Sequence, residues 1–171
     1  MKLLSKNEKI CKIKIWAPRI LFVVYLAIVL RITVFRSDFS FQNFLSGGSI
    51  NLKLLTGYAE LVMGGHWWMF CYLFFGNIIW FVPLGMYLEM IGRTKRLWQA
   101  ALIGFLFSLC IETLQYLFGT GYSELDDLLL NTLGVWVGAV GMRAIKRCKL
   151  YESLFTIADN SVMIERGKGG K

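Results

Sequence analysis

The chain has 171 residues, of which 56% are hydrophobic and 15% aromatic, while only 18% are charged. This composition excludes an ordinary soluble domain, which would need more polar surface at this length. The formal net charge of +8 does not indicate a nucleic-acid-binding protein, because the basic residues form short clusters between long apolar runs. Apolar runs of about 20 residues predict a polytopic membrane protein instead.

Four apolar segments are long enough to cross a bilayer as helices. In chain order they cover residues 16–35, 67–91, 97–118 and 128–144. The fourth is short, near the lower limit of about 17 residues for a span, so we expect it to be tilted or to lie in a thin arrangement. All four are expected to be helical, because lipid offers no hydrogen bonds to an open backbone. The predicted fold is therefore all-α, a bundle of four transmembrane helices.

The distribution of Lys and Arg predicts the orientation of this bundle. Most of the 19 basic residues lie before the first span or at its entry, between the second and third spans, or from the end of the fourth span onward; only Arg31, Arg36 and Lys53 lie elsewhere. The positive-inside rule therefore places both termini in the cytoplasm. The chain then divides into a cytoplasmic N-terminus (1–15), a transmembrane domain (16–145) with an outer loop (36–66), and a cytoplasmic tail (146–171).

Polar residues gather at one depth of these spans, which is costly unless they pair or serve a function. The predicted polar site consists of Arg31, Asn77, Glu112, Gln115, Asp126, Asp127 and Asn131. With a rise of about 1.5 Å per residue, these groups all fall in the outer half of their helices. Those on the third span are expected to face those on the fourth across a hairpin, while Arg31 and Asn77 close the cluster.

Simpler roles are open for several of these residues. Asp126 and Glu124 suit the start of the fourth helix, because Ser123 can serve as its N-cap and acids are favourable at a helix N-terminus. Glu112 lies too deep for such a role. An ion pair with Arg31 that holds two helices together is its simplest explanation.

Small residues and one proline predict how the helices pack. Gly134 and Gly138 form a GxxxG pattern that permits close helix approach, which we expect between the third and fourth spans. Pro83 and Gly85 lie two-thirds of the way along the second span and predict a kink there. The four cysteines have no CxxC spacing, and no metal site or cofactor is predicted.

Three blocks of the sequence resemble the signature of VanZ-like membrane proteins. They are NIIWFVPLG at 77–85, ETLQ at 112–115 and DLLLNTLG at 127–134, in the order and spacing of that family. The resemblance implies a multi-pass protein of the bacterial plasma membrane, in a family whose best-known member lowers susceptibility to lipoglycopeptide antibiotics such as teicoplanin. Membrane lipids, a lipoglycopeptide or a lipid-linked cell-wall precursor are the partners that it implies.

Three classes of function follow from these residues. The first is a binding protein whose outward-facing polar site alters how glycopeptides or lipid-linked precursors meet the cell surface. The second is an intramembrane enzyme acting on a lipid head group, with Glu112, Asp126 and Asp127 as general base or metal ligands beside Asn131. The third is a structural or assembly subunit in which polar groups hold helices together. The binding function is the one we expect.

Overall fold

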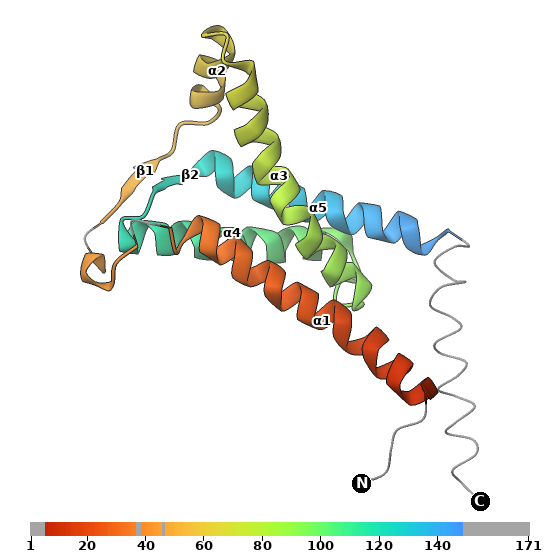
Figure 1. Ribbon diagram of the computed structural model, residues 1–171. Coiled ribbons are helices and arrows are strands. Elements are labelled where there is room, and N and C mark those ends of the chain that lie inside the picture. Colours follow the sequence, from red (N-terminus) through yellow and green to blue (C-terminus); the bar gives the residue numbers. More distant parts are fainter. Residues whose placement is uncertain (1–5, 37–38, 46, 149–171) are drawn as a thin grey trace, which may run out of the picture. The chain divides into compact units, whose positions relative to one another are not determined.

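The computed structural model describes residues 6–36, 39–45 and 47–148 of the chain (Figure 1). Its elements are α1 (Lys6–Thr33), a 3₁₀ turn η1 (Phe41–Asn43), β1 (Ser49–Asn51), α2 (Thr56–Met63), α3 (Trp67–Met90), α4 (Leu97–Phe118), β2 (Tyr122–Glu124) and α5 (Leu125–Lys146). Most of the predicted cytoplasmic tail, from residue 149 onward, lies outside the described residues, as do residues 1–5 of the predicted N-terminus.

The chain forms two compact units. Residues 26–142 make up one of them, which contains all the predicted site residues. The described residues of the other lie at 6–25 and 143–148, and in it the Arg19 guanidinium lies over the Trp16 ring at 5.3 Å from the ring centroid.

Four helices are long and apolar enough to cross a membrane, which confirms the predicted all-α bundle of four spans. They are α3, α4, α5 and the part of α1 from Trp16 to Thr33. The expectation of a short fourth span is wrong, because α5 has 22 residues and begins at Leu125. Its first turn contains Asp126 and Asp127, acids that the positive end of a helix dipole favours, so the helix extends beyond its apolar core.

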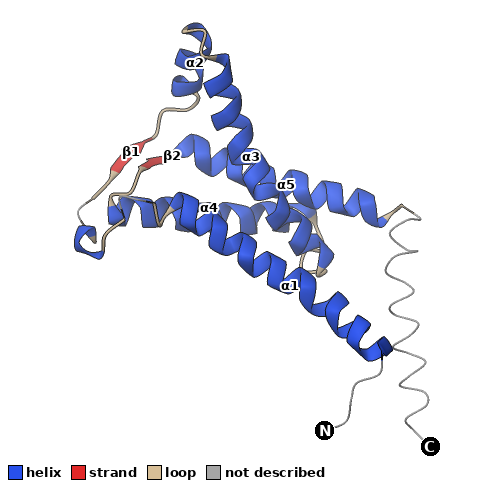
Figure 2. Cartoon of the chain, viewed as in Figure 1, coloured by secondary structure: helices blue, strands red, loops and turns tan. Residues whose placement is uncertain are grey.

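The connection between α1 and α3 is joined to the connection between α4 and α5 by a pair of parallel strands (Figure 2). In β1 and β2, Ser49 lies opposite Tyr122 and Asn51 opposite Glu124. After β1, helix α2 packs on α3 through the Tyr58 ring, which meets two phenylalanine rings of α3 edge-on. The β1–β2 pairing thus places a folded segment beside the connection between α4 and α5.

The backbones of α3 and α5 come so close together that only glycine fits between them. A Cβ atom on Gly85 of α3 would lie 1.9 Å from the carbonyl oxygen of Val135. On α5, a Cβ atom on Gly134 or Gly138 would lie 2.2 Å or 2.1 Å from a carbonyl oxygen of α3. Helix α3 continues through Pro83 to this contact. We call these three glycines the glycine crossing.

The glycine crossing corrects the expected partner of the GxxxG pattern. Gly134 and Gly138 face α3, whereas we expected them to face α4. Helix α4 meets another face of α5, where a Cβ atom on Gly104 would lie 2.7 Å from the Val135 side chain. The GxxxG pattern identifies a surface of α5 that allows close approach, but it does not identify the helix that packs on this surface.

Candidate functional site

Polar side chains gather where α3, α4 and α5 approach the two strands. We call the following set the polar layer: Asn77 of α3, Ser108, Glu112 and Gln115 of α4, Glu124 of β2, and Asp126, Asp127 and Asn131 of α5. Most of these residues are buried. A buried polar group is costly unless it is hydrogen-bonded, so the partners of each one show what the layer does.

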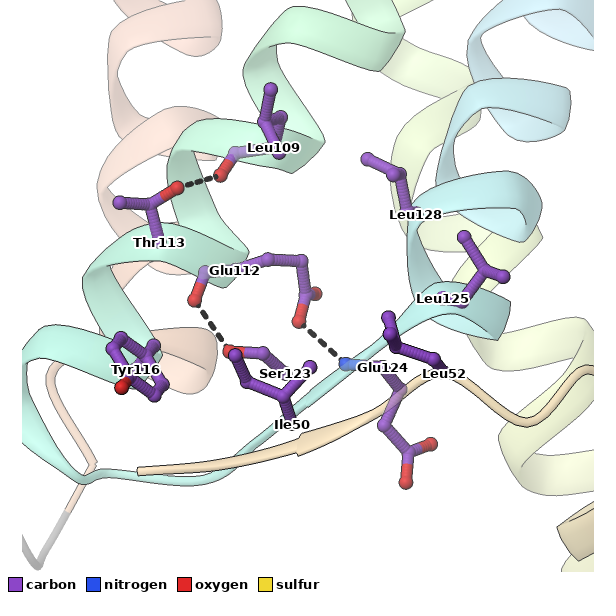
Figure 3. Close-up of a pocket in the computed structure, with 10 residues that line it drawn as sticks. All are labelled: Ile50, Leu52, Leu109, Glu112, Thr113, Tyr116, Ser123, Glu124, Leu125 and Leu128. Carbon is purple, nitrogen blue, oxygen red and sulfur yellow. Dashed lines mark hydrogen bonds between the residues drawn. The ribbon is translucent and has the colours of Figure 1, made fainter. Parts of the chain in front are cut away.

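Glu112 ties α4 to β2. The side chain is 7% exposed, and its Oε2 atom accepts a hydrogen bond of 3.0 Å from the backbone N–H of Glu124 (Figure 3). The Ser123 hydroxyl donates to the backbone carbonyl of Glu112 at 2.7 Å. The expected N-cap role of Ser123 is therefore wrong: the residue belongs to β2, and its hydroxyl is directed to α4 instead of to the start of α5.

Arg31 lies outside this arrangement. Its side chain is exposed, and its guanidinium donates to the backbone carbonyl of Phe35. That carbonyl follows the end of α1, where helix carbonyls lack intrahelical partners and attract basic side chains. The expected ion pair between Arg31 and Glu112 is absent from the described part of the chain.

Asp126 stabilises the segment before α2. Its two carboxylate oxygens accept the backbone N–H of Leu55 at 2.9 Å and 3.0 Å. Leu55 has a left-handed backbone with φ of 56° and immediately precedes α2. Asp126 lies in the first turn of α5, as expected for an acid at a helix N-terminus, and its carboxylate also binds a backbone N–H 71 positions away in the sequence.

Asp127 joins three helices through Asn77. The Asn77 amide donates to the Asp127 carboxylate and, at 3.5 Å, to the hydroxyl of Tyr58. Burial, followed by the nearby Asp127 carboxylate, raises the pKa of Tyr58 to about 12. The raised pKa means that the Tyr58 phenol, which lies beside an acidic group, stays neutral further into the alkaline range than an ordinary tyrosine.

Asn131 and Gln115 each use only part of their hydrogen-bonding capacity. The Asn131 amide donates to the Ser108 hydroxyl at 2.9 Å, and the Gln115 amide donates to the Thr33 carbonyl at 3.3 Å. The amide oxygens of both residues are buried and have no partner among the described residues. The predicted residues, Arg31 excepted, therefore gather in one layer, although each is paired with a different element.

An apolar cavity of about 240 Å³ lies against Glu112 (Figure 3). The lining includes Ile50 and Leu52 from the β1 segment and Leu109, Leu125 and Leu128 from the two helices. Glu112 and Glu124 add polar groups to an otherwise largely apolar wall. The cavity can therefore receive a hydrocarbon chain with a polar group at one end.

An acidic cavity of about 350 Å³ lies on the other side of β1. It is lined by Asn51, Tyr58, Asn77, Glu124, Asp126 and Asp127, among others. Side chains alternate along a strand, so Ile50 and Asn51 belong to different cavities. The β1 residues and Tyr58 were not predicted from the sequence as part of a site. The alternation of apolar and polar residues at 50–52 was the one available indication of a strand there.

The carboxylates are spread across these elements. Among the described residues, no group of three His, Cys, Asp or Glu side chains is placed to hold a metal ion. Nothing in this geometry favours the divalent-metal version of the enzyme hypothesis.

Comparison with known proteins identifies one family. The profile of the VanZ/LLP1 family matches residues 22–146, which covers most of the chain and includes the polar layer, the glycine crossing and both strands. No match was found among curated proteins or among solved structures.

Proposed function

Because the chain belongs to the VanZ/LLP1 family, we propose that it is a multi-pass protein of the bacterial plasma membrane that lowers susceptibility to glycopeptide and lipoglycopeptide antibiotics. Both termini are proposed to be cytoplasmic, on the distribution of basic residues. In this orientation the β1–β2 pair and its two cavities lie at the outer leaflet, where such antibiotics and lipid-linked wall precursors are found.

The observation that carries this proposal is the apolar cavity beside Glu112. A lipoglycopeptide combines an acyl chain with a polar head, and a lipid-linked precursor combines an isoprenoid chain with one. The leucine-rich lining offers an apolar surface against which such a chain can pack. Glu112 and the acidic cavity offer polar contacts to the head. Binding of either molecule here would change how antibiotic and precursor meet.

The proposal is tested by expression in a susceptible host and measurement of teicoplanin sensitivity. Wild type is expected to protect. Leu109→Trp, which fills the cavity, is expected to abolish protection at normal membrane levels. Leu102→Trp is the matched control, because Leu102 lies on the same helix, is similarly exposed and does not line the cavity. No protection by wild type at normal levels would refute the proposal.

A purely structural role makes a different prediction for the polar layer. Glu112→Gln, Asp127→Asn and Asn131→Ala would then all reduce accumulation in the membrane, because the role consists only of holding helices together. Under the binding proposal, Glu112→Gln accumulates normally and loses protection. Immunoblots of membrane fractions beside the sensitivity assay separate the two.

A further inference from the structure

A third hollow, of about 490 Å³, lies at the end of α1 and is lined by none of the residues that line the other two cavities. Its walls come from a residue shortly after the end of α1, from the segment that leads into β1 and from the turn between α4 and β2. The lining includes Arg36, Gly48, Ser49, Thr120, Gly121 and Tyr122. We call it the Arg36 hollow.

Arg36 is the only charged group among the described lining residues of this hollow. Its side chain is exposed, and it has no hydrogen-bond or ion-pair partner within the described chain. Its Nη1 atom lies 3.7 Å from where a Cβ atom on Gly121 would be, so the guanidinium lies close to the glycine-lined wall. An unpaired guanidinium presents five donors in a planar fork that matches the oxygens of a phosphate.

A second donor without a partner lies in the same wall. Thr120 is 4% exposed, and its buried hydroxyl has no partner among the described residues. Burial of a hydroxyl without a hydrogen bond is unfavourable, which a bound acceptor would relieve. Arg36 and Thr120 together offer a charged and a neutral donor to one oxyanion.

The walls are held in place by backbone hydrogen bonds. The N–H groups of Leu45 and Gly48 donate to Leu117 and Tyr116 carbonyls, each at 2.8 Å, and the Thr120 N–H donates to the Gln115 carbonyl at 3.1 Å. A ligand would therefore meet a site that is already formed, which reduces the ordering cost of binding.

Aromatic rings lie beside the hollow, on both sides of Arg36 in the sequence. The Phe39 ring lies 4.8 Å from that of Phe35 and 4.7 Å from that of Phe118. Phe41 and Phe44 extend the cluster and leave large exposed faces, 79% in the case of Phe41. These exposed phenylalanine rings offer an apolar surface to hydrocarbon chains beside the Arg36 guanidinium.

We infer that the Arg36 hollow binds a phosphate group carried by a membrane lipid, with Arg36 and Thr120 as donors to its oxygens and the phenylalanine cluster beside its chains. This inference goes beyond the proposed function and holds whether or not the chain protects against antibiotics.

The test is native mass spectrometry of the full chain in a neutral detergent with three ligands. Phosphatidic acid carries both phosphate and chains, diacylglycerol carries the chains alone, and glycerol 3-phosphate carries the phosphate alone. Wild type is expected to retain phosphatidic acid and neither of the others. Arg36→Gln is expected to lower its occupancy about tenfold, the size of a lost charge-assisted hydrogen bond. Lys53→Gln is the control, since Lys53 is an exposed cation of the same connection that does not line the hollow.

Thr120 keeps the test decisive if Arg36→Gln does not fold. Thr120→Val removes the hydroxyl at equal size and is expected to lower retention, whereas Thr120→Ser keeps the hydroxyl and is expected to preserve it. Equal retention in Thr120→Val and wild type, or equal losses in Arg36→Gln and Lys53→Gln, would overturn the inference. If glycerol 3-phosphate binds as well as phosphatidic acid does, the inference that the phosphate belongs to a lipid is overturned. If diacylglycerol binds as well as phosphatidic acid does, the inference that the hollow recognises a phosphate is overturned.

Discussion

The glycine crossing and the polar layer hold the same unit together by opposite means. At Gly85, Gly134 and Gly138 two helix backbones touch, and no space is left for a single added methyl group. In the polar layer the side chains of α4 and α5 reach outward to β2, α2 and α3, and two buried amide oxygens remain without a partner in the described chain.

This difference indicates which region is free to carry function. A contact made only of backbone atoms and glycine hydrogens can hold helices together but offers no side-chain functional group to a ligand. The polar layer borders two cavities and keeps spare hydrogen-bonding capacity. We therefore expect substitutions at the crossing to act on folding, and substitutions in the layer to cost less stability and to act on function.

The largest effect is expected at the glycine crossing. Gly134→Ala or Gly138→Ala would place a methyl group within about 2.2 Å of an α3 carbonyl oxygen, so the helices must separate. We expect a loss of about 3 kcal/mol or more in the free energy of unfolding, at the upper end for overpacking, and reduced accumulation in the membrane. Thermal unfolding in detergent and membrane immunoblots measure both.

Two other glycines of the same helices are the matched controls. Gly76 in α3 and Gly141 in α5 have no atoms within 4 Å of an added Cβ atom. Gly76→Ala and Gly141→Ala are expected to be neutral or slightly stabilising, because alanine favours the helix. Similar losses at all four positions would show that the close contact is not what makes the crossing sensitive.

An intermediate effect is expected at Asp126. Asp126→Ala removes the carboxylate that accepts the part-buried Leu55 N–H and should cost about 2 kcal/mol, within the usual range for such a group. Faster proteolytic cleavage between β1 and α2 should accompany the loss. Asp126→Asn keeps one acceptor oxygen and should lose less than half as much. Equal losses in the two variants would mean that the carboxylate charge matters more than the hydrogen bond.

The smallest effect at neutral pH is expected at Tyr58, and it grows in alkali. The ordinary pKa of 10.0 applies to the unfolded chain, while the folded pKa is about 12. Stability from the neutral phenol is thus complete below pH 10 and is lost as the pH rises towards 12. Tyr58→Phe keeps the ring contacts between α2 and α3. It should remove the contribution of this phenol to the loss of stability at alkaline pH.

Thermal unfolding of wild type and Tyr58→Phe at neutral and alkaline pH measures the difference. Tyr122→Phe is the control, because the Tyr122 side chain is largely exposed. Parallel stability curves of wild type and Tyr58→Phe between pH 10 and 12 would contradict the assignment.

The spans were predictable from the sequence because length and apolar character are local properties, and α3 and α4 match the expected ranges within one residue. The family was predictable from three short blocks that lie in the matched region. The depth of the polar residues was predicted from helix rise alone, and it stays a prediction.

The partners of these residues were not predictable in the same way. Gly134 and Gly138 indicate close approach, yet nothing in GxxxG distinguishes α3 from α4 as the neighbour. Ser123 has the pattern of an N-cap, and only its pairing with β1 places it in a strand. Arg31 matched Glu112 in depth, but depth leaves the direction around a helix open.

The parallel pairing of β1 with β2 also has a consequence for synthesis. Asn51 and its partner Glu124 are separated by 73 positions. At about 5–20 residues per second, the ribosome adds Glu124 roughly 4–15 s after Asn51. During that interval α3 and α4 are both made in full, but β1 has no strand to pair with. The walls of both cavities therefore form only after the start of α5 has left the ribosome, and a nascent chain stalled before that point would hold a membrane anchor without a site.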